Sequence, residues 1–161
     1  MSMMAMAETQ TDENLKLEIR RVIRASRQRI YAAWTRPEEF QRWFGPPNVS
    51  VLYAEADARE GGTYRITTTA CQAEPGKDEA VRHSSVSGEY LNVIPNLLLR
   101  FTWRPEWNPG EESLVTVQFH EVEGGTELIL KHESFPTEES RNRHEQGWTG
   151  TMVKLADYLE Q

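Results

Sequence analysis

The feature that most constrains this chain is a run of six extended segments with no helical segment between them. They show the period of two typical of strands, and lie at residues 49–58, 63–71, 82–94, 97–104, 115–119 and 128–132. Turns such as Gly61-Gly62, Pro95-Asn96 and Gly124-Gly125 or short polar loops join them. Parallel neighbours would need crossovers of about a dozen residues or more, usually helical. The run therefore predicts an antiparallel sheet with its helices on one face.

A further strand and two short helices are predicted before this run. Apolar and charged residues alternate from Leu15 to Ile23, as in a half-buried strand. Ser26 is a candidate N-cap for a short helix that ends near Pro37. The spacing from Thr35 to Glu38 resembles a capping box and predicts a second short helix.

The C-terminal segment predicts one long helix that begins after an N-cap at Thr137. Its apolar residues recur at spacings of four, three and four, which places them on one side: Trp148, Met152, Leu155 and Leu159. Gly147 and Gly150 lie inside this helix, where each costs about 1 kcal/mol relative to Ala. Either a close approach of the helix backbone to the sheet or a ligand, or a kink between two helices, would account for them.

The predicted order is strand, two helices, six strands and helix. This is an α+β fold in which a curved antiparallel sheet surrounds the long C-terminal helix. Residues 1–13 are expected to form a disordered tail and residues 14–161 a single ligand-binding domain. A domain of this size buries roughly 70% of its unfolded surface, so it needs no metal or disulfide to fold.

Charge and composition exclude several classes of partner and site. The 18 Lys and Arg residues against 25 Asp and Glu give a net charge of −7, which disfavours nucleic acid and anionic membranes. Cys71 is the single cysteine, so no intrachain disulfide can form. No apolar stretch approaches the roughly 18 residues of a membrane-spanning helix. We therefore expect a cytoplasmic protein without a metal or another cofactor.

A curved sheet around one helix tends to leave unfilled volume at its wide end, and such apolar cavities are common ligand sites. The inward positions of the predicted strands and helices are rich in aromatic residues. The candidate ligand-binding residues are Trp43, Phe44, Tyr64, Ile66, Thr68, Tyr90, Phe101, Trp103, Phe119, His132, His144, Trp148 and Met152. The alternative is that the aromatic residues pack into a solid core.

Short motifs in a fixed order give the chain a resemblance to a known family. They are residues 30–38, Trp43-Phe44-Gly45-Pro46, residues 60–64, Gly88-Glu89-Tyr90, residues 99–103, Gly124-Gly125-Thr126 and Gly147-Trp148. Over roughly residues 14–160 the chain resembles the SRPBCC or START-like superfamily, which has the helix-grip fold. Within it, the chain is similar to bacterial proteins related to the C-terminal domain of the activator of the 90-kDa heat-shock protein ATPase. The resemblance implies a cavity between sheet and helix, used elsewhere in the superfamily for lipids, sterols, polyketides and plant hormones.

Three functions remain open from the sequence. The first is a carrier or sensor of a small hydrophobic molecule, without catalysis. The second is a cyclase or hydrolase in which His132 or His144 acts as a general base, although the sequence has no motif for a nucleophile or metal. The third is a module that interacts with a chaperone. Edge strands also make a homodimer possible.

Overall fold

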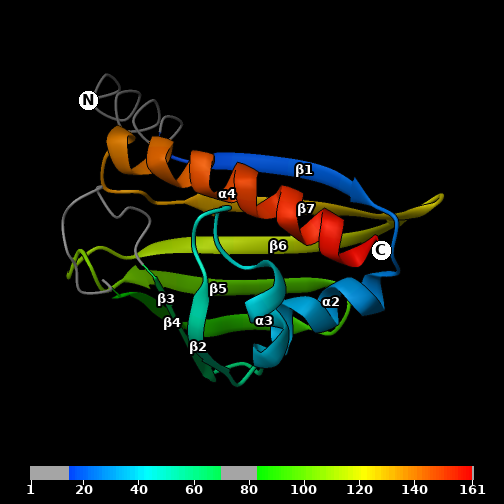
Figure 1. Ribbon diagram of the computed structural model, residues 1–161, viewed down its shortest axis with the longest axis horizontal. Coiled ribbons are helices and arrows are strands. Elements are labelled where there is room, and N and C mark those ends of the chain that lie inside the picture. Colours follow the sequence, from blue (N-terminus) through cyan, green and yellow to red (C-terminus); the bar gives the residue numbers. More distant parts are fainter. Residues whose placement is uncertain (1–14, 70–82, 161) are drawn as a thin grey trace, which may run out of the picture.

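The structure, a computed structural model, describes residues 15–69 and 83–160. The predicted N-terminal tail, the end of the predicted strand 63–71 and Cys71 lie outside the described residues. The elements along the chain are β1 (Leu17–Ile23), α2 (Arg27–Thr35), α3 (Pro37–Trp43), β2 (Val51–Ala56), β3 (Thr63–Thr69), β4 (His83–Ile94), β5 (Leu98–Pro105), β6 (Ser113–Val122), β7 (Gly125–Glu133) and α4 (Glu138–Leu159). This order is the predicted one (Figure 1).

The strands form one curved antiparallel sheet, as predicted. Its order is β1-β7-β6-β5-β4-β3-β2, so the first strand pairs with the last. In the β6–β7 hairpin, Val117 lies opposite Leu130 and Phe119 lies opposite Leu128. Inward residues on the two strands therefore face one another, and their alternation sets the register.

The three helices in the described part of the chain lie on the inner side of the curved sheet. Figure 1 shows α4 running along this face, with α2 and α3 beside its C-terminal half. The hydroxyl oxygen of Thr137 accepts a hydrogen bond from the backbone N–H of Ser140 at 3.1 Å, and Ser26 caps α2 in the same way through Arg29. Both predicted N-caps are thus confirmed.

Three local predictions were wrong. The turn of the last hairpin is Glu123-Gly124, one residue before the predicted Gly124-Gly125, because Gly125 is the first residue of β7 and pairs with Val122. Thr35 does not cap α3, because it is the last residue of α2 and its hydroxyl donates to the carbonyl oxygen of Tyr31 at 2.9 Å. Gly61-Gly62 is not a two-residue turn, because residues 57–62 all lie between β2 and β3. Gly61 has a positive φ of 87°, whereas Gly62 lies so close to the carbonyl of Asp57 that a Cβ atom would clash with it.

Packed aromatic rings fill part of the hollow between sheet and helices. The rings of Tyr64, Tyr90 and Phe101 lie 5.4–5.9 Å apart between centroids. Nearer to α2, the ring of Phe119 meets that of Tyr31 edge to face at 5.6 Å. The side chains of Tyr64, Tyr90, Phe101 and Phe119 are almost completely buried, and Tyr31 is partly buried. In this part of the hollow the aromatic residues therefore form a solid core.

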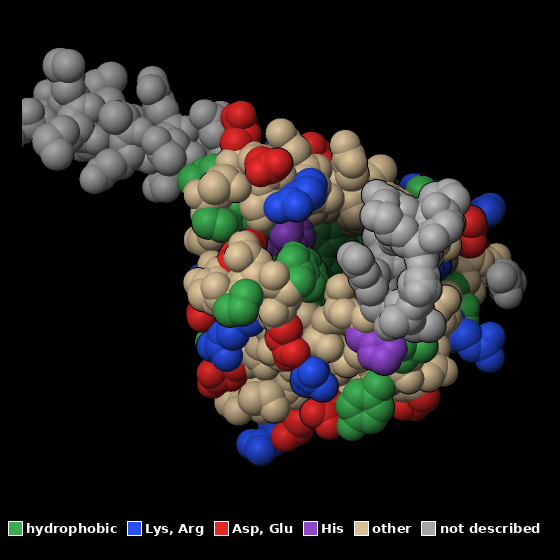
Figure 2. All heavy atoms as spheres, turned by 60° about the vertical axis from the view of Figure 1, so that its left-hand side comes forward, with side chains coloured by type: hydrophobic (Ala, Val, Ile, Leu, Met, Phe, Trp, Pro, Cys, Tyr) green, Lys and Arg blue, Asp and Glu red, His purple; other side chains and the backbone are tan. Residues whose placement is uncertain are grey.

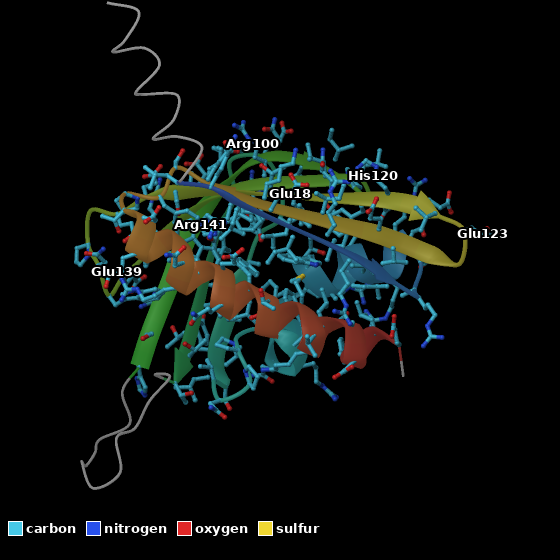
Figure 3. All side chains as sticks on the ribbon, turned by 90° about the horizontal axis from the view of Figure 1, so that it is seen from above. Glu18, Arg100, His120, Glu123, Glu139 and Arg141 are labelled. Carbon is cyan, nitrogen blue, oxygen red and sulfur yellow. The ribbon has the colours of Figure 1, made fainter. Side chains whose placement is uncertain are left out.

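The opposite face of the sheet is polar. Figure 3 shows Arg100 and His120 on the side away from α4, and the register places Glu18 in the same outward row as Lys131. Among the described residues, none of the helices is both long and apolar enough to span a membrane.

Candidate functional site

A pocket of about 330 Å³ opens beside the N-terminal half of α4. The helix, the α3–β2 connection, strands β3, β4 and β5 and the β5–β6 connection enclose it. Figure 2 shows the hollow at this end of the molecule, with hydrophobic side chains inside it. The lining residues are Phe44, Gly45, Pro46, Val49, Ile66, Thr68, Thr69, Ser84, Val86, Trp103, Trp107, Glu111, Ser140, Arg143, His144, Gly147, Trp148 and Thr151.

Aromatic rings build one wall of the pocket. Trp148 on α4 and Trp103 on β5 lie 5.3 Å apart between ring centroids, and Phe44 lies 6.3 Å from Trp103 and 6.5 Å from Trp148. Trp148 stacks on Trp34 of α2 behind the wall, at 6.0 Å. Strand, helix and loop thus each contribute a ring to one apolar surface.

A buried histidine holds the indole of Trp148. The Trp148 Nε1–H donates to Nδ1 of His132 at 3.0 Å, and His132 Nε2 lies 2.7 Å from the hydroxyl oxygen of Ser113. Because an indole nitrogen can only donate, Nδ1 of His132 must be the acceptor. The neutral ring therefore carries its proton on Nε2 and donates it to Ser113.

A second histidine holds Trp103 in the same manner. The Trp103 Nε1–H donates to Nε2 of His144 at 3.2 Å, and His144 Nδ1 lies 2.8 Å from the carbonyl oxygen of Ser140. Since a carbonyl only accepts, the proton of His144 is on Nδ1. Both indole N–H groups of the wall are thus satisfied, and the rings present carbon to the pocket.

Burial keeps both histidines neutral. It lowers the pKa of His132 well below the usual value, with a smaller effect from the neighbouring His144. Burial also lowers the pKa of His144, opposed mainly by the hydrogen bond to Ser140. Each basic ring nitrogen already accepts a hydrogen bond from a tryptophan. Neither histidine therefore has a free lone pair for a proton from a bound molecule.

Polar groups gather at one side of the mouth. Glu111 on the β5–β6 connection accepts hydrogen bonds from the Ser140 hydroxyl, at 2.9 Å, and from the side chain of Asn108. Arg143 lies on the same side and is exposed. Trp107, of which 53% is exposed, lies on the same connection. Among the described residues, the lining thus has one basic and one acidic group together with an exposed indole ring.

The two glycines of α4 have different surroundings. The helix is continuous through both, so it is not broken into two helices there. A Cβ atom built on Gly147 would meet no atom of another element within 4 Å, because this residue faces the open pocket. A Cβ atom on Gly150 would lie 3.0 Å from Cδ of Pro47. Close approach therefore applies to Gly150, although its neighbour is a loop and not the sheet.

The predicted ligand-binding residues divide into two groups. The pocket wall contains Phe44, Ile66, Thr68, Trp103, His144 and Trp148. Those that lie in the packed core and are not among the lining residues are Trp43, Tyr64, Tyr90, Phe101, Phe119, His132 and Met152. Of these, His132 reaches the site indirectly through its hydrogen bond to Trp148.

The sequence analysis did not predict several of the residues that line the pocket. Pro46, Trp107 and Glu111 lie in connections, where no period marks the inward positions. Val49 was predicted at the start of the strand 49–58, but β2 begins only at Val51. The helical residues carried a signal, because Ser140, His144, Gly147 and Thr151 recur at spacings of four, three and four. In the described part of the chain, no three His, Cys, Asp or Glu side chains are grouped so as to hold a metal ion.

Comparison with known proteins agrees with this architecture. The protein CV1439 of Chromobacterium violaceum has a crystal structure with a TM-score of 0.77 and 25% identity, and the match covers 91% of this chain and 97% of that one. The AHSA1 protein of Silicibacter pomeroyi gives a TM-score of 0.74 at 24% identity, with coverages of 89% and 96%. These similarities extend over the whole fold described above.

The family can be named from sequence as well. The chain is 28% identical over 116 residues to the mouse activator of 90 kDa heat shock protein ATPase homolog 1. That match covers 71% of this chain but 30% of the mouse protein, so the chain spans less than a third of the relative's length. The model of the family described as "Activator of Hsp90 ATPase homolog 1-like protein" matches residues 24–160. The chain therefore belongs to this family, within the SRPBCC superfamily.

Proposed function

We propose that this protein binds a small, largely apolar molecule in the pocket beside α4, as a carrier or sensor. The observation that carries the proposal is the open pocket of about 330 Å³ with a wall formed by Phe44, Trp103 and Trp148. A concave apolar wall with a few polar groups at its edge is the usual composition of a ligand site. Family membership supports the proposal, because the fold commonly binds hydrophobic ligands.

The arrangement favours binding over catalysis. Proton transfer needs a basic atom within hydrogen-bond reach of the substrate. The acceptor nitrogens of His132 and His144 are already bound to indole N–H groups, and His132 is completely buried. A general base at either position would first have to break the contact that holds the aromatic wall.

A pocket-filling variant tests the proposal directly. Thermal shift assays with fatty acids, sterols and aromatic compounds should find a ligand, and at about 100 times its Kd we expect a rise in Tm of roughly 5–10 °C. In Gly147→Leu this rise should disappear, because the new side chain enters the pocket from a position with free space around it. Gly147→Ala is the matched control, since it makes a similar gain in helix propensity without filling the pocket. Undiminished binding by Gly147→Leu would contradict the assignment of the site.

A second candidate function is interaction with a chaperone. The relative in mouse is named as an activator of the 90 kDa heat shock protein ATPase. Outside the pocket, Leu91, Ile94 and Leu97 expose their side chains around the β4–β5 turn. We expect this chaperone to be retained by the immobilised protein and lost from an Ile94→Lys, Leu97→Lys variant. The pocket variant Gly147→Leu should retain it, and equal retention by all three proteins would contradict a role for the turn.

A further inference from the structure

We infer that the ligand of this pocket is a small aromatic acid of about two fused rings, with its carboxylate paired to Arg143. The inference rests on the proposed function and specifies its ligand class. Three properties of the pocket support this inference. They are its volume, the aromatic composition of its wall, and the hydrogen bonding of its two charged residues, since Glu111 already has partners whereas Arg143 has none among the described residues.

The volume limits the size of the ligand. The pocket has a volume of about 330 Å³. This lies near the lower end of the usual range for ligand pockets. A bicyclic aromatic molecule suits a pocket of this size better than a sterol or a two-chain lipid does.

The wall favours a flat ring over a flexible chain. The Trp103 and Trp148 rings are fixed on two elements, and their N–H groups are occupied by His144 and His132. The surface that remains is aromatic carbon, which attracts other rings in offset or edge-to-face geometry beyond the effect of area alone. A rigid ring also loses less conformational freedom on binding than an alkyl chain.

The charged groups at the mouth favour an anion. Each carboxylate oxygen of Glu111 already accepts a hydrogen bond, one from Asn108 and one from Ser140. Arg141 pairs with Glu145 at 2.7 Å, whereas Arg143 forms no ion pair with any residue that the structure describes. Among residues 15–69 and 83–160, no partner occupies the donors of the Arg143 guanidinium, and a carboxylate matches their planar geometry. A cationic ligand would instead have to compete with the bonds that Glu111 already makes.

A pair of matched probes separates charge from shape. 2-Naphthoic acid and 2-naphthamide have nearly the same shape, and at pH 7.5 only the acid is charged. Isothermal titration calorimetry should show the acid binding the unmodified protein about fivefold more tightly, in keeping with an ion pair at a partly exposed mouth. Arg143→Gln should abolish this preference by weakening the acid alone. Glu111→Gln should strengthen the acid, because it removes a nearby negative charge, and leave the amide unchanged.

Arg141→Gln is the control for the loss of one positive charge on the same helix. Its side chain bonds to the carbonyl of Lys16 and to Glu145, and it is not among the lining residues, so the preference should persist. The inference is overturned if the amide binds as tightly as the acid, or if the preference survives in Arg143→Gln. Binding of the amide without that preference would leave the proposed function standing. If neither probe binds and the wider ligand screen finds nothing, the proposed function fails together with this inference.

Discussion

The buried His132 predicts how the stability of this protein depends on pH. Its side chain is completely buried and neutral, and burial holds its pKa far below that of a histidine in an unfolded chain, about 6.5. As the pH falls below about 6.5, the unfolded chain therefore binds a proton that the folded protein does not. The unfolded state is stabilised by about 1.4 kcal/mol per pH unit for this one group. Between pH 7.5 and 5.0 the protein should lose at most about 2 kcal/mol of its free energy of unfolding through His132, the limit for a folded histidine that stays neutral over this range.

Urea unfolding followed by circular dichroism at both pH values measures this loss, and His132→Gln should reduce it by the part that His132 contributes, at most about 2 kcal/mol. The amide oxygen of glutamine can still accept from Trp148, so the variant removes the titration while keeping an acceptor. His120→Gln, on the exposed outer face of the sheet, is the matched control and should leave the loss unchanged (Figure 3). For each protein, the free energy of unfolding at pH 5.0 is compared with that of the same protein at pH 7.5. A lower stability of His132→Gln at pH 7.5 therefore does not affect the result. An unchanged loss in His132→Gln would refute the reasoning.

Two further predictions concern packing around the helices. Tyr158→Phe removes a hydroxyl that donates to Glu39 at 2.8 Å, and should cost about 1 kcal/mol, seen as a Tm lower by roughly 2–4 °C. The exposed Tyr53→Phe, which loses a similar bond to Glu55, should change the Tm by much less, and equal effects would contradict a special role for the α3–α4 contact. Gly147→Ala should raise the free energy of unfolding by about 1 kcal/mol. Gly150→Ala should gain less, because its Cβ atom would press on Pro47, and equal gains in urea unfolding would contradict that contact.

The fold was largely predictable because local periods settle most of it. The alternation in residues 115–119 and 128–132 set both the strands and the inward residues of the last hairpin, which the register confirms. Local rules failed where two elements compete for one residue. Thr35 could have capped α3, but a residue inside α2 reaches the carbonyl of Tyr31 more readily. The pairing of β1 with β7 was not predicted, because it joins residues about 110 positions apart and has no local signal.

The pocket could be predicted only in part, because a period shows which way a side chain points but not whether the space in front of it is filled. Tyr90 and Trp103 both point inward, yet Tyr90 packs against Phe101 and Tyr64 whereas Trp103 borders the open pocket. That difference depends on α2 and α3, which lie beside the C-terminal half of α4 and leave the N-terminal half free (Figure 1). The positions of these short helices follow from long-range packing that no single segment encodes.

Trp148 lies between the packed aromatic core and the pocket, and this position explains why the polar residue His132 is buried beside it. The Trp148 ring stacks on Trp34, and it also lines the pocket. An aromatic ring beside an empty space would gain contacts by turning into it, and the pocket would then close. The hydrogen bond from its indole N–H to His132 opposes that rotation, since breaking it would leave two buried polar groups unpaired. His132 therefore acts on the pocket without lining it, because it fixes the Trp148 ring of the wall, and under the proposed function this would reduce the ordering that binding requires.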